Sequence, residues 1–202
     1  MSLSIDVISD VVCPWCFIGK RRLEAALALY REAHPDAPAA QVRWWPYELN
    51  PDLPPGGMGR AAYLERKFGA GRSAEVYARV SAVGREVGIE FAFDRIARQP
   101  NTLAAHSLIA LAGEAGVQDA LQEALFSAYF LEGMDLTDAE TLVRIGTGAG
   151  LAEADVRARL ADAGACEAVR AHEEQARRMG VSGVPFFVFN QALAVSGAHE
   201  PE

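Results

Sequence analysis

The chain has 202 residues, half of them hydrophobic, which is enough for one large domain with a sizeable buried core. Its formal charge of -8 and the absence of a basic stripe argue against nucleic acid as a partner, because non-specific binding to the phosphate backbone needs a positive surface. Three cysteines are too few for a framework of structural disulfides in a chain of this size.

The sequence also gives expectations for membranes and location. It has no run of about 18 apolar residues that would span a bilayer. Its first residues, MSLSIDVISD, lack the charged and apolar regions of a signal peptide. We therefore expect no membrane partner and a cytoplasmic location, where a close pair of cysteines is more often catalytic or metal-binding than structural.

The first elements predict a β-α-β unit. The alternating pattern of LSIDVIS, with Leu3, Ile5 and Val7 on one face, predicts a strand. Apolar residues at helical spacing after Pro14 predict a helix that ends near HPDAP. QVRWWPYEL then predicts a second, parallel strand with aromatic residues in the core, and NPDLPPGGMG predicts a loop. Cys13 thus falls at the junction of a strand and a helix.

The middle of the chain, residues 60–164, predicts a block of amphipathic helices separated mainly by glycines. Residues 165–202 return to mixed structure, with a helix, the strand PFFVF, a two-residue turn and the strand ALAVS. The predicted apolar face of that helix consists of Val169, His172, Ala176 and Met179. The fold class is therefore α/β, in the order β-α-β, helical insertion, α-β-β, with residues 1–59 and 165–202 forming one domain.

The pair Cys13-Pro14-Trp15-Cys16 is the main candidate for chemistry. A thiolate is the nucleophile in thiol–disulfide exchange, and a helix N-terminus and a Cys-X-X-Cys setting both favour the thiolate. Cys13 occupies that position, and Cys16 lies one helical turn further on. We assign Cys13 as the attacking nucleophile and Cys16 as the resolving thiol, with their redox-active disulfide in place of a bound cofactor.

Four stretches in this order, SDVVCPWCFIGKRRLE, PYELNPDLPPGG, QPNTLAAHSLI and GVSGVPFFVF, resemble the DsbA family of thioredoxin-fold thiol oxidoreductases. Within that family the chain is most similar to the FrnE-like group of dithiol-disulfide isomerases. The resemblance implies a thioredoxin fold with a helical insertion and a cis bond between Val184 and Pro185 beside the cysteines. It also implies that the Val184 backbone binds extended substrate, and it keeps a site-lining role open for His106. We include Phe17 among the candidate substrate contacts.

Several other residues are candidates for roles at or near the cysteine pair, and two of them have alternative interpretations. Trp15 and Pro14 tune the pair, and because Trp15 stands where strongly oxidising members have histidine, we expect a less oxidising disulfide. Asp10 either caps the turn before the helix or relays protons to the thiol. His106 is either a packing residue or part of the site. Cys166 has no close second ligand pair among the histidines, so we expect a buried inert thiol and no metal site.

A second function class has the same layout. Kappa-class glutathione transferases and 2-hydroxychromene-2-carboxylate isomerases use this fold with glutathione as cosubstrate. They typically have serine at the position of Cys13 and a Ser-Asp pair where this chain has Ala198-His199. Both differences favour dithiol chemistry, with glutathione kept as a candidate cosubstrate beside thiol or disulfide substrates. The substrate, the direction of exchange and the oligomeric state, including a homodimer, are left open.

Overall fold

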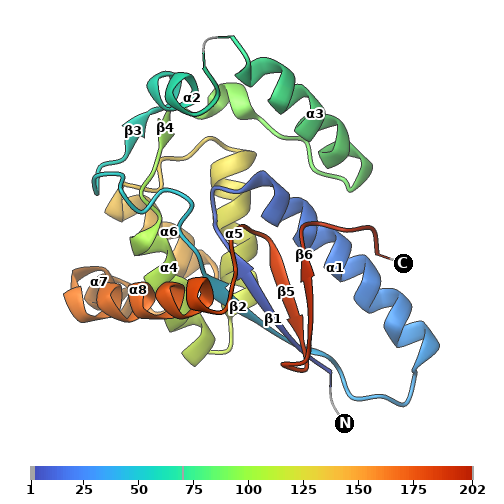
Figure 1. Cartoon of the computed structure of the whole chain (residues 1–202). Helices are drawn as coiled ribbons and strands as arrows, with labels where there is room; N and C mark the ends of the chain where they lie inside the picture. Colours follow the sequence, from blue (N-terminus) through green and yellow to red (C-terminus); the bar gives the residue numbers. More distant parts are fainter. Residues whose placement is uncertain (1–2, 70, 202) are drawn as a thin grey trace.

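The structure is a computed structural model and describes residues 3–69 and 71–201. Its main sheet has the order β2-β1-β5-β6, with β1 parallel to β2 and antiparallel to β5, and β5 antiparallel to β6. The bounds of these strands are Ser4–Ser9, Gln41–Pro46, Phe186–Phe189 and Leu193–Ser196, for β1, β2, β5 and β6 in turn. This is the α/β thioredoxin-type sheet that the sequence predicts, and Figure 1 shows it at the centre of the molecule.

Two helices adjoin the sheet from the two ends of the chain. Helix α1 spans Pro14–Ala33 and follows β1 directly, while α8 spans Ala163–Arg178 and precedes β5. Ile5 and Val7 of β1 point into the large core that includes α1, whereas Ile8 packs with Ala176 of α8 in a smaller cluster. The alternation predicted for the first strand is therefore confirmed, because successive side chains enter different cores.

The helical insertion lies between β2 and α8. It contains α2 (Arg60–Phe68), α3 (Ser73–Glu86), α4 (Leu103–Glu114), α5 (Gln118–Phe130), α6 (Ala139–Gly148) and α7 (Glu153–Ala161), with the 3-10 helix Phe93–Arg95. A two-stranded sheet pairs β3 (Met58–Gly59) with β4 (Arg98–Gln99). In Figure 1, α2 and α3 arch over the end of the main sheet at which α1 begins.

Three local predictions differ from the structure. The segment that we predicted as a loop, NPDLPPGGMG, ends in β3, which pairs with β4 about 40 residues later, a partner that no local pattern reveals. One predicted helical stretch is split into α2 and α3 at Gly69 and Gly71, which both have positive φ. The predicted start of the last domain at residue 165 falls just inside α8.

The apolar face of α8 is also shifted. Val169 and Ala176 are buried as predicted, but His172 is exposed and Met179 has 69% of its surface exposed. Glu173 is buried in their place, because its carboxylate accepts a hydrogen bond from the backbone N–H of Glu48 at 2.8 Å. A glutamate in an amphipathic helix is expected on the solvent-exposed face, so the spacing of apolar residues did not predict the burial of Glu173.

Candidate active site

Cys13 lies at the turn from β1 into α1. It is the residue before the first helical residue, with extended backbone angles of φ -94° and ψ 111°, and Pro14 follows at the first helical position. Its backbone N–H donates to the Asp10 carbonyl at 3.0 Å, and its own carbonyl accepts from Cys16 N–H at 3.0 Å. These bonds fix the Cys13 side chain at the positive end of α1, where an anion is stabilised.

The two thiols differ in environment. Both cysteines are free thiols and buried, with 4% of Cys13 and 1% of Cys16 exposed. Burial raises the pKa of Cys16 well above its usual value, and the hydrogen bond and charge of Cys13 raise it further. Cys16 therefore keeps its proton at neutral pH, and the two thiols are not equivalent.

The loop before β5 lies against the Cys13 sulfur. The Val184–Pro185 peptide bond is cis, and Cys13 Sγ donates to the Val184 carbonyl at 3.6 Å. Pro185 is buried, and a Cβ atom at Gly19 of α1 would come within 3.0 Å of Pro185 Cγ. Because position 19 is a glycine, α1 can approach the loop that contains Pro185 closely. This approach accompanies the contact between Cys13 and Val184, which are 171 positions apart in sequence.

A cluster of buried polar side chains lies behind the cysteines. Asp10 is fully buried, its carboxylate accepts from the Leu49 N–H at 2.8 Å, and His106 Nε2 is 3.5 Å from Asp10 Oδ1. Glu48 and Glu173 are buried nearby. Burial raises the pKa of Glu48 to about 7, and the charge of Glu173 adds to this effect. The cluster therefore contains a carboxyl group that changes its protonation state near neutral pH.

Comparison with known proteins identifies the family of this chain. The model of the DSBA-like thioredoxin domain matches residues 4–202. The chain belongs to this family. A probable DsbA oxidoreductase from Streptomyces coelicolor is 33% identical, with a TM-score of 0.87 and coverage of 98% of this chain and 85% of that chain.

Two more distant structures share the fold. The cytosolic disulfide reductase DsbM from Pseudomonas aeruginosa, solved with GSH, is 18% identical, with a TM-score of 0.67 and coverage of 96% of this chain and 89% of that one. A 2-hydroxychromene-2-carboxylate isomerase is 14% identical, with a TM-score of 0.65 and the same two coverages. A disulfide reductase and a 2-hydroxychromene-2-carboxylate isomerase therefore share this fold. The fold alone does not distinguish the two function classes, so the distinction has to come from the residues of the site.

Within this DSBA-like site, two predicted substrate contacts are placed in the interior. Phe17 is fully buried and stacks on Phe126 with ring centroids 5.0 Å apart, and only 2% of His106 is exposed. Phe126 belongs to α5 and His106 to α4, so both predicted contacts lie in the packed interior formed with the insertion. Substrate contact for Phe17 and His106 stays a prediction, and the structure places His106 beside Asp10.

The other predicted residues lie as follows. Trp15 is the exposed member of the motif, with 36% of its surface exposed, and Val184 is half-buried. Cys166 is half-buried, in contrast to our expectation of a buried thiol, because the neighbouring Ala165 occupies the buried face of α8. Among residues 3–69 and 71–201 there is no group of three or more side chains suited to a metal ion. None of the described helices is long and apolar enough to cross a membrane.

Sequence reasoning missed Glu48 and Glu173 as parts of the site. Glu48 follows the second strand and Glu173 lies in the middle of α8, so neither is near the cysteines in sequence. The only local signal was the position of Glu48 directly after the buried aromatic run of QVRWWPY. Their proximity depends on the packing of α8 against β2.

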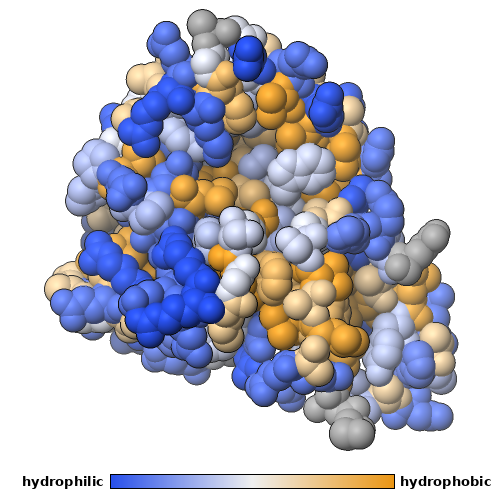
Figure 2. Space-filling view, viewed as in Figure 1, coloured by the Kyte–Doolittle hydropathy of each residue, from blue (hydrophilic) through white to orange (hydrophobic). Residues whose placement is uncertain are grey.

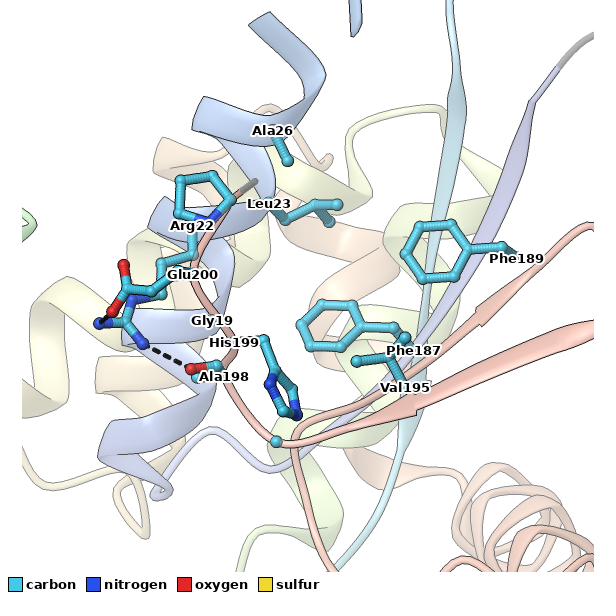
Figure 3. A pocket seen from close by; sticks show the side chains of 12 residues that line it. Gly19, Arg22, Leu23, Ala26, Phe187, Phe189, Val195, Ala198, His199 and Glu200 are labelled. Carbon is cyan, nitrogen blue, oxygen red and sulfur yellow. Dashed lines mark hydrogen bonds and ion pairs between the residues drawn. The ribbon is translucent and has the colours of Figure 1, made fainter. Parts of the chain in front are cut away.

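A groove between α1 and the sheet is separate from the cysteines (Figure 3). It has a volume of about 490 Å³, and hydrophobic side chains gather on the surface over β5 and β6 in Figure 2. The groove is lined by Gly19, Arg22, Leu23, Ala26, Phe187, Phe189, Val195, Gly197, Ala198, His199, Glu200 and Pro201. Arg22 donates to the Ala198 carbonyl and pairs with Glu200, which holds the last described residues along its rim.

Proposed function

We propose that this DsbA-like protein is a thiol–disulfide oxidoreductase or isomerase in which Cys13 attacks and Cys16 resolves. The observation that carries the proposal is the asymmetry of the pair: Cys13 directly precedes α1 and donates to the Val184 carbonyl, whereas burial raises the pKa of Cys16. Thiol–disulfide exchange needs a thiolate that attacks first, here Cys13, and a second thiol that stays protonated until the resolving step, here Cys16.

In the reducing direction, the Cys13 thiolate attacks one sulfur of a substrate disulfide. A mixed disulfide forms, and the other substrate sulfur leaves as a thiolate. Cys16 then loses its proton and attacks Cys13 Sγ, which releases the second substrate thiolate and leaves a Cys13–Cys16 disulfide. Two electrons pass from the dithiol to the substrate, and the same steps in reverse oxidise a substrate dithiol.

Substrate binding follows from the same loop. The Val184 carbonyl already accepts a hydrogen bond from Cys13 and lies two residues before β5, so an extended peptide can pair with this backbone as an added strand. Protein and small thiols both fit this mode, and glutathione is a cosubstrate consistent with the GSH in the DsbM structure. The FrnE-like group and a cytoplasmic location remain part of this proposal.

The experiment is insulin reduction and refolding of a scrambled disulfide substrate, with wild type, Cys13→Ser and Cys16→Ser. We expect Cys13→Ser to lose activity in both assays, and Cys16→Ser to accumulate mixed disulfides that denaturing, non-reducing gels detect. Cys166→Ser is the matched control, because the third cysteine is half-buried on α8 and should leave both activities unchanged.

Two results would contradict the proposal. Activity that survives in Cys13→Ser would remove Cys13 as the nucleophile. A wild type that fails in both assays but isomerises 2-hydroxychromene-2-carboxylate with glutathione would support the alternative class instead.

A further inference from the structure

The helices α2 and α3 carry positive charge in a protein that is acidic as a whole. Residues 60–86 contain six Lys and Arg residues and three Glu residues, a net charge of +3, whereas the whole chain has a formal charge of -8. The other residues therefore hold a net charge of -11, from 13 Lys and Arg and 24 Asp and Glu residues. The two signs of charge are thus separated between α2–α3 and the rest of the molecule.

Five of these six cations are exposed, and we call them the basic cap. They are Arg66, Lys67, Arg72, Arg79 and Arg85. Within the part of the chain that the structure describes, none of the five pairs with a carboxylate, whereas nine Lys and Arg side chains outside α2 and α3 do. Lys67 Nζ donates to Tyr63 Oη at 2.8 Å, a neutral partner that leaves its charge in place. The positive charge of the basic cap is therefore not neutralised by these residues.

On α3, two arginines of the basic cap flank an exposed valine. Arg72, Val76 and Arg79 are spaced by four and three residues, so they lie on one face of the helix. Val76 has 39% of its surface exposed. This face offers apolar contact between two cations. A polypeptide with acidic and apolar side chains fits such a face, whereas contacts to a phosphate backbone are polar.

The basic cap lies at the same end of the molecule as the candidate active site. In Figure 1, α2 and α3 arch over the end of the main sheet at which α1 begins, and α3 packs against α1. Cys13 is the residue directly before α1. A substrate that reaches Cys13 from this end therefore passes through the field of the basic cap, which at low salt extends over about 30 Å.

We infer that the basic cap recruits acidic segments of polypeptide substrates to Cys13, so that the protein prefers disulfides with acidic flanking residues. The cap supplies cations for the carboxylates and Val76 for an apolar neighbour. The acidic remainder of the molecule repels the same substrates, which directs them to the end that carries the cysteines. Glu65, Glu75 and Glu86 interrupt the cations, which disfavours a nucleic acid or an anionic membrane as the partner. This inference rests on the proposed function of Cys13.

The test compares peptides of equal length that differ only in the charge beside a single cysteine. A run of glutamates, serines or lysines precedes the cysteine, which is joined by a disulfide to 2-nitro-5-thiobenzoate. The Cys13 thiolate of the reduced protein attacks the peptide sulfur and releases the coloured thiolate. Cys16 then attacks Cys13 Sγ, which frees the peptide thiolate and leaves the Cys13–Cys16 disulfide. Division by the rate with dithiothreitol corrects for the intrinsic reactivity of each peptide.

For wild type at about 10 mM salt, we expect the second-order rate constant of the glutamate peptide to exceed that of the serine peptide by about fivefold or more. The lysine peptide should be slower than the serine peptide. About 300 mM salt should remove most of both differences, because it screens the field of the basic cap. Equal rate constants for the peptides at low salt would overturn the inference.

Double variants assign the preference to the basic cap. Arg72→Gln with Arg79→Gln should slow the glutamate peptide by about threefold or more and change the serine peptide by less than about twofold. Arg72→Glu with Arg79→Glu should make the glutamate peptide slower than the serine peptide. The matched control is Arg31→Gln with Arg144→Gln, which removes two exposed arginines from α1 and α6 and should keep the wild-type preference. The same preference in the cap variants and the control would contradict the inference.

Binding without sulfur separates this inference from the proposed function. By fluorescence anisotropy at about 10 mM salt, a labelled polyglutamate peptide without cysteine should bind wild type at least about threefold more tightly than Arg72→Gln with Arg79→Gln. If it does, but wild type reacts with none of the peptide disulfides, the proposed function fails and the basic cap stands. If the disulfides react but polyglutamate binds both proteins equally, the basic cap fails alone.

Two further probes test the commitment to a polypeptide. They are an oligothymidylate of the same charge as the polyglutamate peptide and vesicles that contain phosphatidylserine. We expect both to bind wild type more weakly than polyglutamate does. If either binds more tightly and loses affinity in Arg72→Gln with Arg79→Gln, the partner is a phosphate surface and the inference is wrong.

Discussion

At the scale of single residues, the two thiols of the candidate active site, Cys13 and Cys16, lie in different environments. Cys13 and Cys16 are three residues apart, yet one begins a helix beside the Val184 carbonyl and the other is enclosed by the core. Burial raises the pKa of Cys16 well above its usual value, so this thiol keeps its proton at neutral pH. In the proposed function, this difference assigns the attacking and resolving roles to the two thiols.

Trp15 is the residue through which the potential of the pair can be tested. It is the exposed residue between the cysteines and supplies no cationic charge beside the Cys13 thiolate. We predict that Trp15→His makes the disulfide more oxidising, by about 30 mV or more, because a protonated imidazole stabilises the thiolate of the reduced form. Equilibration with glutathione buffers measures this potential.

Trp15→Phe is the control for the loss of the indole, and it should stay close to wild type. A wild type that already equilibrates as strongly oxidising as DsbA, roughly -120 mV, would contradict the expectation drawn from Trp15.

At the scale of elements, the active site is made by the contact between α1 and the loop before β5. Gly19 is the residue that permits this contact, since an added Cβ would lie 3.0 Å from Pro185 Cγ and 3.2 Å from Phe187 Cζ. Both atoms belong to buried side chains in a packed region, so neither can move freely.

We therefore predict that Gly19→Ala lowers the free energy of unfolding by about 1–3 kcal/mol and slows exchange at Cys13. Gly148→Ala is the matched control: Gly148 is also helical, at the end of α6, and an added Cβ there meets no atom within 4 Å. Urea denaturation of both variants checks the stability, and insulin reduction checks the exchange. Equal stability of Gly19→Ala and wild type would show that the α1 contact is not tight.

At the scale of the whole molecule, the buried carboxyl cluster couples folding to pH. Glu48 follows β2 and Glu173 belongs to α8, while Asp10 follows β1 directly and His106 belongs to α4. The folded protein holds a proton on Glu48 up to a pKa of about 7, whereas the unfolded chain releases it near the usual value of 4.5. The native state therefore binds more protons between these values, and rising pH favours unfolding.

From Glu48 we predict a loss of about 3 kcal/mol in the free energy of unfolding as the pH rises from 4.5 through 7. The raised pKa of Glu173 acts in the same direction. Glu48→Gln should remove most of this dependence, since glutamine resembles the protonated acid and does not titrate. Denaturant unfolding over this pH range measures the effect.

Glu167→Gln is the control, because Glu167 is an exposed carboxylate on α8. If Glu48→Gln and Glu167→Gln show the same pH dependence as wild type, Glu48 does not titrate in this range in the folded protein.

The sequence by itself predicted the main β-α-β and α-β-β elements and the position of the cysteine pair between β1 and α1. Alternation in β1, the Cys-X-X-Cys motif before α1 and the paired strands around Asn190 and Gln191 are local patterns, and the structure contains each of them. Both turn residues have positive φ, as a two-residue hairpin turn requires. Such features are predictable because neighbouring residues define them.

Only the tertiary structure decided which distant groups surround the thiols. Phe17 and His106 proved to be interior residues, and Glu48 and Glu173 joined the buried cluster behind the cysteines from segments with no local signal. The physical reason is that burial of a polar or charged side chain depends on partners supplied by other elements, so spacing along the chain cannot reveal it. The pair of cysteines was therefore predictable, but the environment that gives each thiol its role was not.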